Sequence, residues 1–590
     1  MPGTVEAESP AVGGFGRTET ESLPEGTARV RAVTRPRPAR DQRARTAGAR
    51  GPRGPRTRPA SVPASPSRAR PGDGTLVPGG WADEGPSSTR RPGRSPVPAA
   101  PTVPRLVPAP RSVEVREGAP FVVSASTAVT VGVSPAEVSL GVLAAEGLSR
   151  VSGSTVEVRY RDVAEPTQPG DVALRLDDAL AGEQYRLDVA TDLVEIVAGT
   201  PEGLMRGLAT LHQLVRPVDG GYAAWPVHVE DEPVHGWRGL SVDVARHFFG
   251  PDDLRVVVEL MAAYKLNVLH LHLSDDQGWR LDLPSRPELT ARSSATAVDG
   301  DPGGFFTTEE YEALVAYAAA RGVRVVPEID VPGHVNAALH AYGELNPSGE
   351  PTEEYTGIEV GFSKLAADLP ATEPFLRDVF GDVAAVTPGD YVHIGGDEVL
   401  TMEREEYARL VAMASDAVRA AGKQVVGWQE IATTPLEPGT VVQYWDTRMD
   451  PAPFVAAASA GARLLMSPGS KAYLDMKYDK DSALGLEWAG HIELRDAYEW
   501  EPTALVPGLP AGSVIGVEAA VWTETLRGLD DLLTMLLPRL AAVAEVAWTR
   551  PEQRDWADFR ERIAAHGPAW DARGLSWYPS PQVDWHVDRS

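Results

Sequence analysis

The stretch Gly239-Leu-Ser-Val-Asp-Val-Ala-Arg-His-Phe-Phe249 decides the fold class of this 590-residue chain. Its first five residues have the short apolar pattern of a buried strand. An open, doubly wound sheet would need a glycine-rich phosphate turn directly after such a strand. The chain continues instead with Val-Ala-Arg-His-Phe-Phe, which disfavours the open sheet and favours a closed barrel.

The same pattern, a short apolar strand followed by an amphipathic helix, recurs through residues 233–578. The predicted strands span residues 239–243, 268–273, 324–329, 391–395, 424–428, 441–444, 464–467 and 515–520. The predicted helices include residues 251–264, 308–321, 403–421 and 529–547. Eight parallel strands that alternate with helices predict an α/β fold, a (β/α)8 TIM barrel with enlarged loops.

Two segments precede this predicted barrel, and a short one follows it. Residues 1–104 are rich in Pro, Arg, Gly and Ser, which predicts a disordered, solvated tail, with a basic arm that touches acidic polymers as the alternative. Residues 105–232 alternate β-branched stretches with two helical patterns and predict a small α+β domain. Residues 579–590 are expected to form a C-terminal tail. No apolar run follows Arg90-Arg91, so we expect no export signal and leave the localisation unassigned.

Charge and composition exclude several classes of partner. The net charge is −27, and residues 1–100 hold 17 Arg against 9 acidic residues, so the remaining 490 residues carry 39 basic and 74 acidic side chains. A body this acidic repels a phosphate backbone, and we expect no nucleic-acid partner. The lack of cysteine excludes disulfides, thiolate zinc sites and iron–sulfur clusters. No apolar run reaches the roughly 18 residues of a membrane helix, so no membrane partner is expected.

Polar side chains follow the predicted strands one after another. Active sites of TIM barrels lie at the carboxyl ends of the strands. In chain order these ends hold Arg246, 274–279 (Ser-Asp-Asp-Gln-Gly-Trp), Glu328-Ile-Asp330, Pro332-Gly-His334, His393-Ile-Gly-Gly-Asp-Glu398, Gly427-Trp-Gln-Glu430, Tyr444-Trp-Asp446, Tyr473-Leu-Asp475 and Trp522-Thr-Glu524. One carboxylate at a strand end is often a helix cap. Eight such ends on one face predict an active site.

The composition of this face indicates a carbohydrate substrate. Its tryptophans can stack on the C–H faces of a sugar, and its carboxylates can accept hydrogen bonds from hydroxyls. An anionic substrate would need more Lys and Arg. Each tryptophan can alternatively be interpreted as an ordinary core residue. No HExxH-like spacing is present, so we expect no metal site and no cofactor.

The dipeptide Asp397-Glu398 carries the strongest indication of the chemistry. Glycoside hydrolysis needs a carboxylic acid that protonates the leaving oxygen, and a nucleophile or negative charge beneath the anomeric carbon. Neighbouring residues leave a strand in divergent directions, so the pair is poorly placed to supply both groups. Asp397 and Glu398 can each take one of the remaining roles if a C2 acetamido oxygen of the substrate is the nucleophile. Gly395-Gly396 permits close approach of the sugar; a helix-capping Asp followed by a first-turn Glu is the structural alternative.

These residues resemble a known family. The runs that carry the resemblance are 243–249, Leu273-Ser-Asp-Asp-Gln-Gly-Trp-Arg280, Glu328-Ile-Asp-Val-Pro-Gly-His334, His393-Ile-Gly-Gly-Asp-Glu398 and Trp522-Thr-Glu524. In this order, over about residues 105–578, they are similar to the retaining β-N-acetylhexosaminidases, which are chitobiase-like glycoside hydrolases. The resemblance implies a TIM barrel beside an accessory α+β domain, and a mechanism in which the substrate assists.

The resemblance also implies roles for matching residues around the N-acetyl group. Glu398 resembles the general acid/base, and Asp397 resembles the residue that orients the acetamido group and stabilises the oxazolinium-like intermediate. Tyr473 would donate its hydroxyl to the acetamido oxygen. Four tryptophans would surround the sugar: Trp428, Trp445 and Trp522 at the acetamido group, and Trp488 as a platform for the leaving sugar.

The remaining implied roles concern the sugar hydroxyls and the acid. Arg246 would grip the C3 and C4 hydroxyls, with Glu524 on C4 and Asp475 near C6. Asp275 and His334 resemble a supporting pair that adjusts Glu398 for its role. The alternative interpretation of His334 is a hydrogen-bonded structural histidine.

We therefore predict an exo-acting enzyme that hydrolyses terminal non-reducing GlcNAc and GalNAc β-glycosides with retention. The alternatives are a double-displacement glycosidase with a carboxylate nucleophile, and an inactive carbohydrate-binding barrel. The second would lack the acid or the acetamido holder, and both are present. The partner is an N-acetylhexosamine-containing oligosaccharide or glycoconjugate. The choice among chitin fragments, glycans and peptidoglycan pieces stays open, as does the oligomeric state.

Overall fold

The computed structural model of the protein describes residues 103–160, 167–219, 221–399 and 401–585. Apart from residues 103 and 104, the tail predicted over residues 1–104 lies outside these ranges, and so does Arg90-Arg91. The last five residues of the predicted C-terminal tail also lie outside them. Within the described ranges, no helix combines the length and apolar character needed to cross a membrane.

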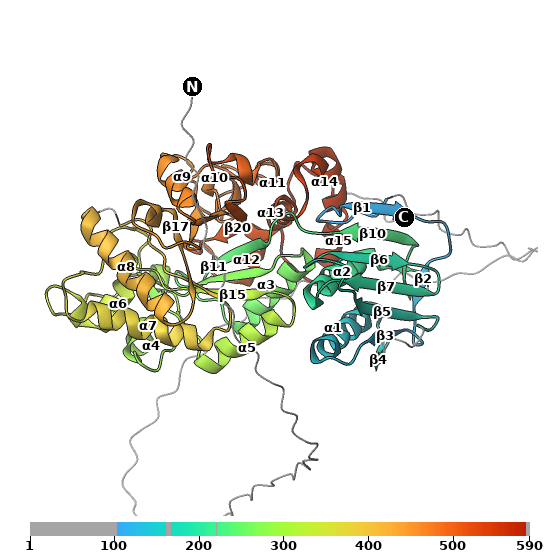
Figure 1. Ribbon diagram of the computed structural model, residues 1–590, viewed down its shortest axis with the longest axis horizontal. Coiled ribbons are helices and arrows are strands. Elements are labelled where there is room, and N and C mark those ends of the chain that lie inside the picture. Colours follow the sequence, from blue (N-terminus) through green and yellow to red (C-terminus); the bar gives the residue numbers. More distant parts are fainter. Residues whose placement is uncertain (1–102, 161–166, 220, 400, 586–590) are drawn as a thin grey trace, which may run out of the picture. The chain divides into compact units, whose positions relative to one another are not determined.

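The first described region is the expected small α+β domain (Figure 1). Its strands are β1 (Ser112–Val115), β2 (Phe121–Val123), β3 (Ala128–Val131), β4 (Glu157–Tyr160), β5 (Asp171–Leu176), β6 (Tyr185–Val189), β7 (Leu193–Ala198), β8 (Arg216–Val218), β9 (Gly221–Ala224) and β10 (Val227–Asp231). Seven of them form a mixed sheet in the order β1-β10-β6-β7-β5-β3-β4. The two predicted helices are α1 (Pro135–Ser152) and α2 (Pro201–Leu214). A capping box between Ser134 and Glu137 starts α1, and Gly153 in a left-handed conformation ends it.

The second region is a closed parallel barrel, which confirms the predicted fold class. Its strands, in barrel order, are β11 (Trp237–Asp243), β12 (Val268–His272), β15 (Arg324–Glu328), β16 (Tyr391–His393), β17 (Gln424–Trp428), β18 (Val441–Tyr444), β19 (Arg463–Met466) and β20 (Val514–Val521). The helices are α3 (Pro251–Ala263), α4 (Glu288–Ser293), α5 (Thr308–Ala319), α6 (Asn336–Ala341), α7 (Thr372–Val386), α8 (Arg404–Ala420), α9 (Ala452–Ser459), α10 (Gly469–Ala472), α11 (Leu494–Tyr498), α12 (Leu529–Leu536), α13 (Arg539–Trp548), α14 (Trp556–Ala564) and α15 (Gly567–Ala572). A short hairpin, β13 (Ser274–Asp275) and β14 (Gly278–Trp279), follows β12.

All eight predicted strands are present within two residues of their expected ends. One helix prediction was wrong. The stretch 529–547 is not a single helix but two, because Pro538 separates α12 from α13. Proline lacks the N–H that a continuing helix needs and restricts the residue before it, so it ends the first helix.

The barrel interior is layered. One layer is a separate apolar cluster made of Trp237, Val268, Val326, Val426, Val441 and Leu465. Two residues further along five of these strands lie His270, Glu328, Trp428, Gln443 and Ser467, all essentially without solvent exposure. Side chains two apart on a strand point to the same side. The second layer is therefore largely polar and lies on the side of the apolar layer that faces the carboxyl ends of the strands.

A buried ion pair joins the small domain to the barrel. Lys265, between α3 and β12, donates from Nζ to Asp231 Oδ2 at 2.8 Å and to the Tyr185 hydroxyl at 2.9 Å. Its ammonium also lies 4.6 Å from the ring of Trp548 at the end of α13. Trp548 Nε1 donates to the other oxygen of Asp231 at 3.0 Å. The side chains of Lys265 and Asp231 are each 1% exposed, so water screens little of this attraction.

We expect Lys265→Met to lower the free energy of unfolding by about 3–5 kcal/mol, because it leaves the Asp231 carboxylate buried without its cation. Chemical and thermal unfolding would measure the loss. The control is Lys480→Met, which removes an exposed lysine paired with Asp481 and should change stability by less than about 0.5 kcal/mol. Equal effects of the two substitutions would contradict a stabilising role for the buried pair.

Candidate active site

The turn after β16 presents Asp397 and Glu398. Gly395 has φ of 69° and Gly396 has φ of 109°, a region that favours glycine. A Cβ atom on Gly395 would lie 1.8 Å from Oδ1 of Asp330, so glycine is required for this close approach. Glu398 has φ of 52°, a conformation that costs a non-glycine residue about 1–2 kcal/mol. The surrounding fold holds the pair in an uncommon backbone conformation, as is frequent at functional sites.

A chain of charged side chains leads away from Glu398. His334 Nε2 lies 3.6 Å from Oε2 of Glu398 and 3.8 Å from Oδ2 of Asp397. Its other ring nitrogen, Nδ1, donates to Asp275 Oδ1 at 3.2 Å, and Asp275 Oδ2 lies 2.6 Å from Arg246 Nη2. Burial opposes the charge of His334, but Asp275, together with Asp397 and Glu398, outweighs burial and raises its pKa. Arg246 and His334 likewise overcome burial and lower the pKa of Asp275. Glu398 therefore faces an imidazolium.

Five aromatic rings line the same face. The ring centroids of Trp428 and Trp522 lie 5.8 Å apart, and those of Trp522 and Tyr473 lie 6.1 Å apart. Tyr473 is nearly parallel to Trp445 at 6.3 Å, and Trp488 meets Trp445 edge-on at 5.8 Å. Four of these rings are less than a tenth exposed, whereas Trp488 is 45% exposed. The aromatic row therefore begins at the barrel interior and ends at Trp488 in solvent.

The other end of the site combines one cation with two carboxyl groups. The Arg246 guanidinium lies 4.9 Å from the ring centre of Trp522. Burial raises the pKa of Glu524 to about 7, although Arg246 opposes the shift. Burial, with Glu524 nearby, raises the pKa of Asp475. Both carboxyl oxygens of Asp475 are buried without a hydrogen-bond partner among the described residues, a costly state that a ligand hydroxyl would relieve.

Asp397 lies among other carboxyl groups. Burial raises its pKa to about 6; Glu398 adds to the shift and His334 opposes it. Burial and then Asp397 raise the pKa of Asp330, which accepts a hydrogen bond from the backbone N–H of residue 396 at 3.1 Å. Burial and Asp397 also raise the pKa of Glu430 to about 8. Glu430 is therefore neutral near pH 6, where Asp397 loses its proton.

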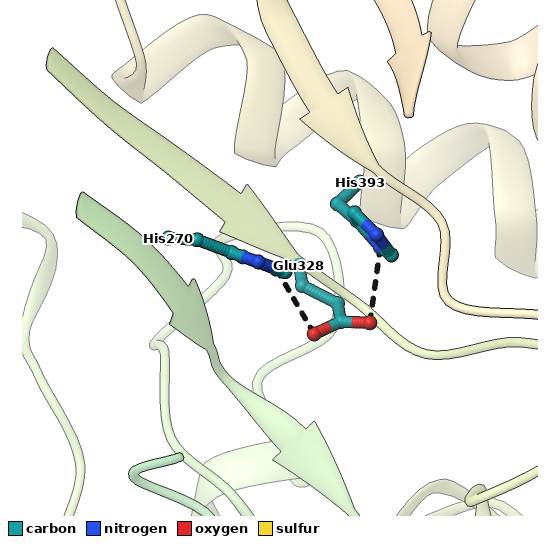
Figure 2. Close-up of side chains that lie close together, drawn as sticks. All are labelled: His270, Glu328 and His393. Atoms are coloured by element: carbon teal, nitrogen blue, oxygen red, sulfur yellow. Dashed lines mark ion pairs between the residues drawn. The ribbon is translucent and has the colours of Figure 1, made fainter. Parts of the chain in front are cut away.

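Histidines and carboxylates also cluster in the polar layer of the barrel, where His270 and His393 flank Glu328 (Figure 2). His270 Nε2 lies 3.0 Å from Glu328 Oε2, and His270 Nδ1 lies 2.9 Å from Glu518 Oε1. Burial opposes protonation, but the two carboxylates outweigh it and raise the pKa of His270 to about 9. This arrangement is an ion-pair cluster.

The structure brings all twelve predicted site residues into one continuous set at the carboxyl ends of the barrel strands. They are Arg246, Asp275, His334, Asp397, Glu398, Trp428, Trp445, Tyr473, Asp475, Trp488, Trp522 and Glu524. The carboxylates of this neighbourhood that were not predicted as site residues include Glu328, Asp330 and Glu430. Their signal was present, since each stands in a strand-end fragment, but nothing in those fragments distinguished them from helix caps or solvated carboxylates.

Comparisons with known proteins agree on one family. Residues 235–551 match "Glycosyl hydrolase family 20, catalytic domain", and residues 103–232 match "Glycosyl hydrolase family 20, domain 2". A Beta-N-acetylhexosaminidase of Cellulomonas fimi is 63% identical over 81% of this chain and 97% of its own length. A Beta-hexosaminidase of Akkermansia muciniphila is 35% identical over 66% of this chain and 83% of its own. The structure of a Streptomyces plicatus N-acetyl-beta-hexosaminidase in complex with Thio-NAglucal superposes with a TM-score of 0.79, at 42% identity, over 82% of this chain and 99% of that one.

Proposed function

Because the chain belongs to glycosyl hydrolase family 20, we propose that the strand-end cluster is its active site and releases one terminal N-acetylhexosamine at a time. The protein is a β-N-acetylhexosaminidase, a glycoside hydrolase that acts by substrate-assisted catalysis. The acetamido oxygen of the substrate attacks the anomeric carbon, so the enzyme has to supply a proton and stabilise the intermediate. These two tasks set the roles proposed for its residues.

Glu398 acts as the general acid and later as the general base. It is the carboxyl group of the pair with partial solvent access, its side chain being 32% exposed. It can therefore reach the leaving oxygen and, in the second step, a water molecule. The His334 imidazolium 3.6 Å away stabilises the carboxylate that Glu398 becomes after it has given up its proton. Asp275 holds His334 in its charged form, and Arg246 keeps Asp275 ionised.

Asp397 and Tyr473 hold the acetamido group. Oδ1 of Asp397 is buried with no partner among the described residues, so it is free to accept the acetamido N–H. That hydrogen bond orients the nucleophilic oxygen and stabilises the positive charge that develops in the oxazolinium. Burial and then Asp397 raise the pKa of Tyr473, which keeps its hydroxyl protonated as a donor to the acetamido oxygen. Three tryptophans surround the group: Trp428, Trp445 and Trp522.

The remaining residues bind hydroxyls of the same sugar and fix its position. Arg246 donates to the C3 and C4 hydroxyls, while Glu524 binds at C4 and Asp475 near C6. The raised pKa values of Glu524 and Asp475 suit a neutral ligand, because burial disfavours the charged carboxylate and a protonated carboxyl group can both donate and accept a hydrogen bond. A further residue linked at C4 would displace Arg246 and Glu524 from that hydroxyl, so we expect the enzyme to be exo-acting on GlcNAc and GalNAc ends. Trp488 supports the leaving sugar.

The organisation of the chain completes the proposal. Residues 105–232 form the accessory domain and residues 233–578 form the catalytic barrel. No residue of the accessory domain belongs to the proposed site.

The observation that carries this proposal is the contact of Asp397 and Glu398 with one histidine beside the row of aromatic rings. A paired-substrate assay tests it. Turnover of an aryl N-acetyl-β-glucosaminide is compared with turnover of the aryl β-glucoside that has the same leaving group. We expect the glucoside to be hydrolysed far more slowly, because it lacks the internal nucleophile. Comparable rates, or a 2-fluoro sugar that labels an enzyme carboxylate, would reject substrate assistance.

The ionisation of Asp397 predicts the acidic side of the pH profile. Asp397 has to be charged to stabilise the oxazolinium, and its pKa is raised to about 6. A carboxyl group loses its proton as pH rises through its pKa, so kcat/KM for an aryl N-acetylglucosaminide should increase between about pH 5 and pH 7. Initial rates over pH 4–8, with the stability of the enzyme checked at each pH, measure this acidic limb of the pH profile of kcat/KM. A midpoint near pH 4 would show that burial does not set the ionisation of this group.

A further inference from the structure

Glu328 has four polar partners in the polar layer, although it takes no part in the proposed proton transfer or in binding the sugar. Its Oε1 accepts a hydrogen bond from Trp428 Nε1 at 2.7 Å and lies 3.0 Å from His393 Nδ1. Its Oε2 lies 2.6 Å from His272 Nδ1 and 3.0 Å from His270 Nε2. Figure 2 shows two of these histidines on either side of the carboxylate. The side chain has no solvent exposure, so protein groups alone satisfy it.

One of the four contacts continues into the proposed site. His272 Nε2 lies 2.9 Å from Asp275 Oδ2, the same oxygen that contacts Arg246 at 2.6 Å. Asp275 Oδ1 in turn accepts from His334, which faces Glu398. His272 thus connects Glu328 to the chain of charged residues that ends at the general acid.

We propose that His272 and Glu328 are positioning residues of the reaction. His272 fixes Asp275 and, through it, His334 and Glu398, while Glu328 holds His272 and Trp428 in one arrangement. The inference rests on the proposed function, since it assumes that Glu398 is the acid and that Trp428 contacts the acetamido group. The buried carboxylate of Glu328 then aligns Glu398, the proton donor, with Trp428, which contacts the acetamido group that acts as the nucleophile.

The charges around His272 agree with this role. It faces Glu328 on β15, Asp275 on β13, Arg246 after β11, whose Nη1 lies 3.3 Å from Nε2, and Asp330 after β15. Burial and Arg246 oppose its protonation, but Glu328 and Asp275 outweigh them and raise its pKa. A doubly protonated imidazole donates to one carboxylate from each nitrogen, which fixes both the ring and its two partners.

His270 provides a matched control for His272. It stands two residues earlier on β12, is equally buried and also lies against Glu328. Its second nitrogen contacts Glu518, away from Asp275. Removing either histidine takes one cation from Glu328, but only the loss of His272 breaks the connection to the acid.

The experiment compares two N-acetylglucosaminides, one with a 4-nitrophenyl and one with a methyl leaving group, in His272→Gln, His272→Leu and His270→Gln. We expect both His272 variants to lose about 10-fold more kcat/KM on the methyl glycoside than on the nitrophenyl glycoside, because the acid matters most for a poor leaving group. His270→Gln should keep the wild-type ratio. The ratio does not depend on the fraction of folded enzyme, since both rates scale with it.

Three further measurements extend the test. Loss of the His272 cation makes proton loss from nearby groups less favourable, so the alkaline limb of kcat/KM should move to higher pH in His272→Gln and stay in place in His270→Gln. Glu328→Gln should lower kcat/KM on both substrates, because it disturbs Trp428 as well as His272. If the His272 variants do not fold, nitrogen-15 NMR of histidine-labelled wild-type enzyme decides, because a singly protonated His272 ring at pH 7 would overturn the proposal.

The outcomes separate this inference from the proposed function. Glu398→Gln is measured in parallel, and if it shows no dependence on the leaving group, the proposed function itself fails. If Glu398→Gln behaves as expected while the His272 variants keep the wild-type ratio and alkaline limb, the role of His272 is rejected. The role of His272 would also be rejected if His270→Gln changed the ratio of kcat/KM on the two glycosides as much as His272→Gln does. The change would then reflect the packing of the polar layer.

Discussion

Glu398→Gln is expected to lower kcat/KM by about 10²–10⁴-fold on a glycoside with a poor leaving group, such as the methyl glycoside or a GlcNAc disaccharide. The amide has nearly the shape of the carboxyl group but cannot give up a proton to the leaving oxygen. An aryl substrate with an acidic phenol leaves without that proton and should lose much less. Steady-state rates across a series of phenols of different acidity would show a steeper dependence on the leaving group in the variant.

The matched control for this substitution is Glu403→Gln. Glu403 lies in the same strand-to-helix connection, immediately before α8, and its side chain is exposed. It should behave as the wild type on every substrate. An equal loss on good and poor leaving groups in Glu398→Gln would contradict the assignment of the general acid, since such a loss indicates a general disturbance of the turn.

Asp397→Asn is expected to lower kcat/KM by about 10²–10³-fold on good and poor leaving groups alike. The carboxylate acts on the acetamido group and on the charged intermediate, and neither depends on which group departs. The substitution also removes the charge that stabilises the oxazolinium, while the amide keeps the volume of the side chain. Rates on the same phenol series should fall in parallel, and an oxazoline-like inhibitor with a charged ring should bind more weakly.

Asp390→Asn is the control for this second variant. Asp390 is exposed and precedes β16 at the end opposite to the site. We expect it to have the wild-type rates and the wild-type acid limb of the pH profile. If Asp397→Asn kept that limb unchanged, the group that titrates near pH 6 would have to be another residue.

The order of the elements could be predicted from the sequence because it depends on local pattern. Each barrel strand is a short apolar run, and the polar residue that ends it marks the site. Residues as distant as Arg246 and Glu524 could therefore be assigned to one face from their positions at strand ends alone. The break at Pro538 is also a local signal, since proline acts through local geometry. The apolar periodicity continues on both sides of this proline, however. The periodicity therefore wrongly indicates one helix over residues 529–547.

The charged layer inside the barrel could not be predicted in the same way. The contact between His270 and Glu518 joins residues 248 positions apart on β12 and β20, which lie on either side of β11 only when the barrel closes. The sequence around Glu328 gives no indication that this carboxylate points inward rather than toward solvent. Its four partners come from three other strands, β12, β16 and β17, and only the closed barrel brings them together.

The buried pair of Lys265 and Asp231 limits how this protein can be shortened or recombined. A truncation that starts at residue 233 would keep the lysine and discard its carboxylate, and would leave the indole of Trp548 without a hydrogen-bond acceptor. A chimera that takes its accessory half from a relative would have to import an aspartate and a tyrosine at the equivalents of positions 231 and 185. The two halves therefore have to be kept or exchanged together, because a buried contact outside the proposed active site joins them.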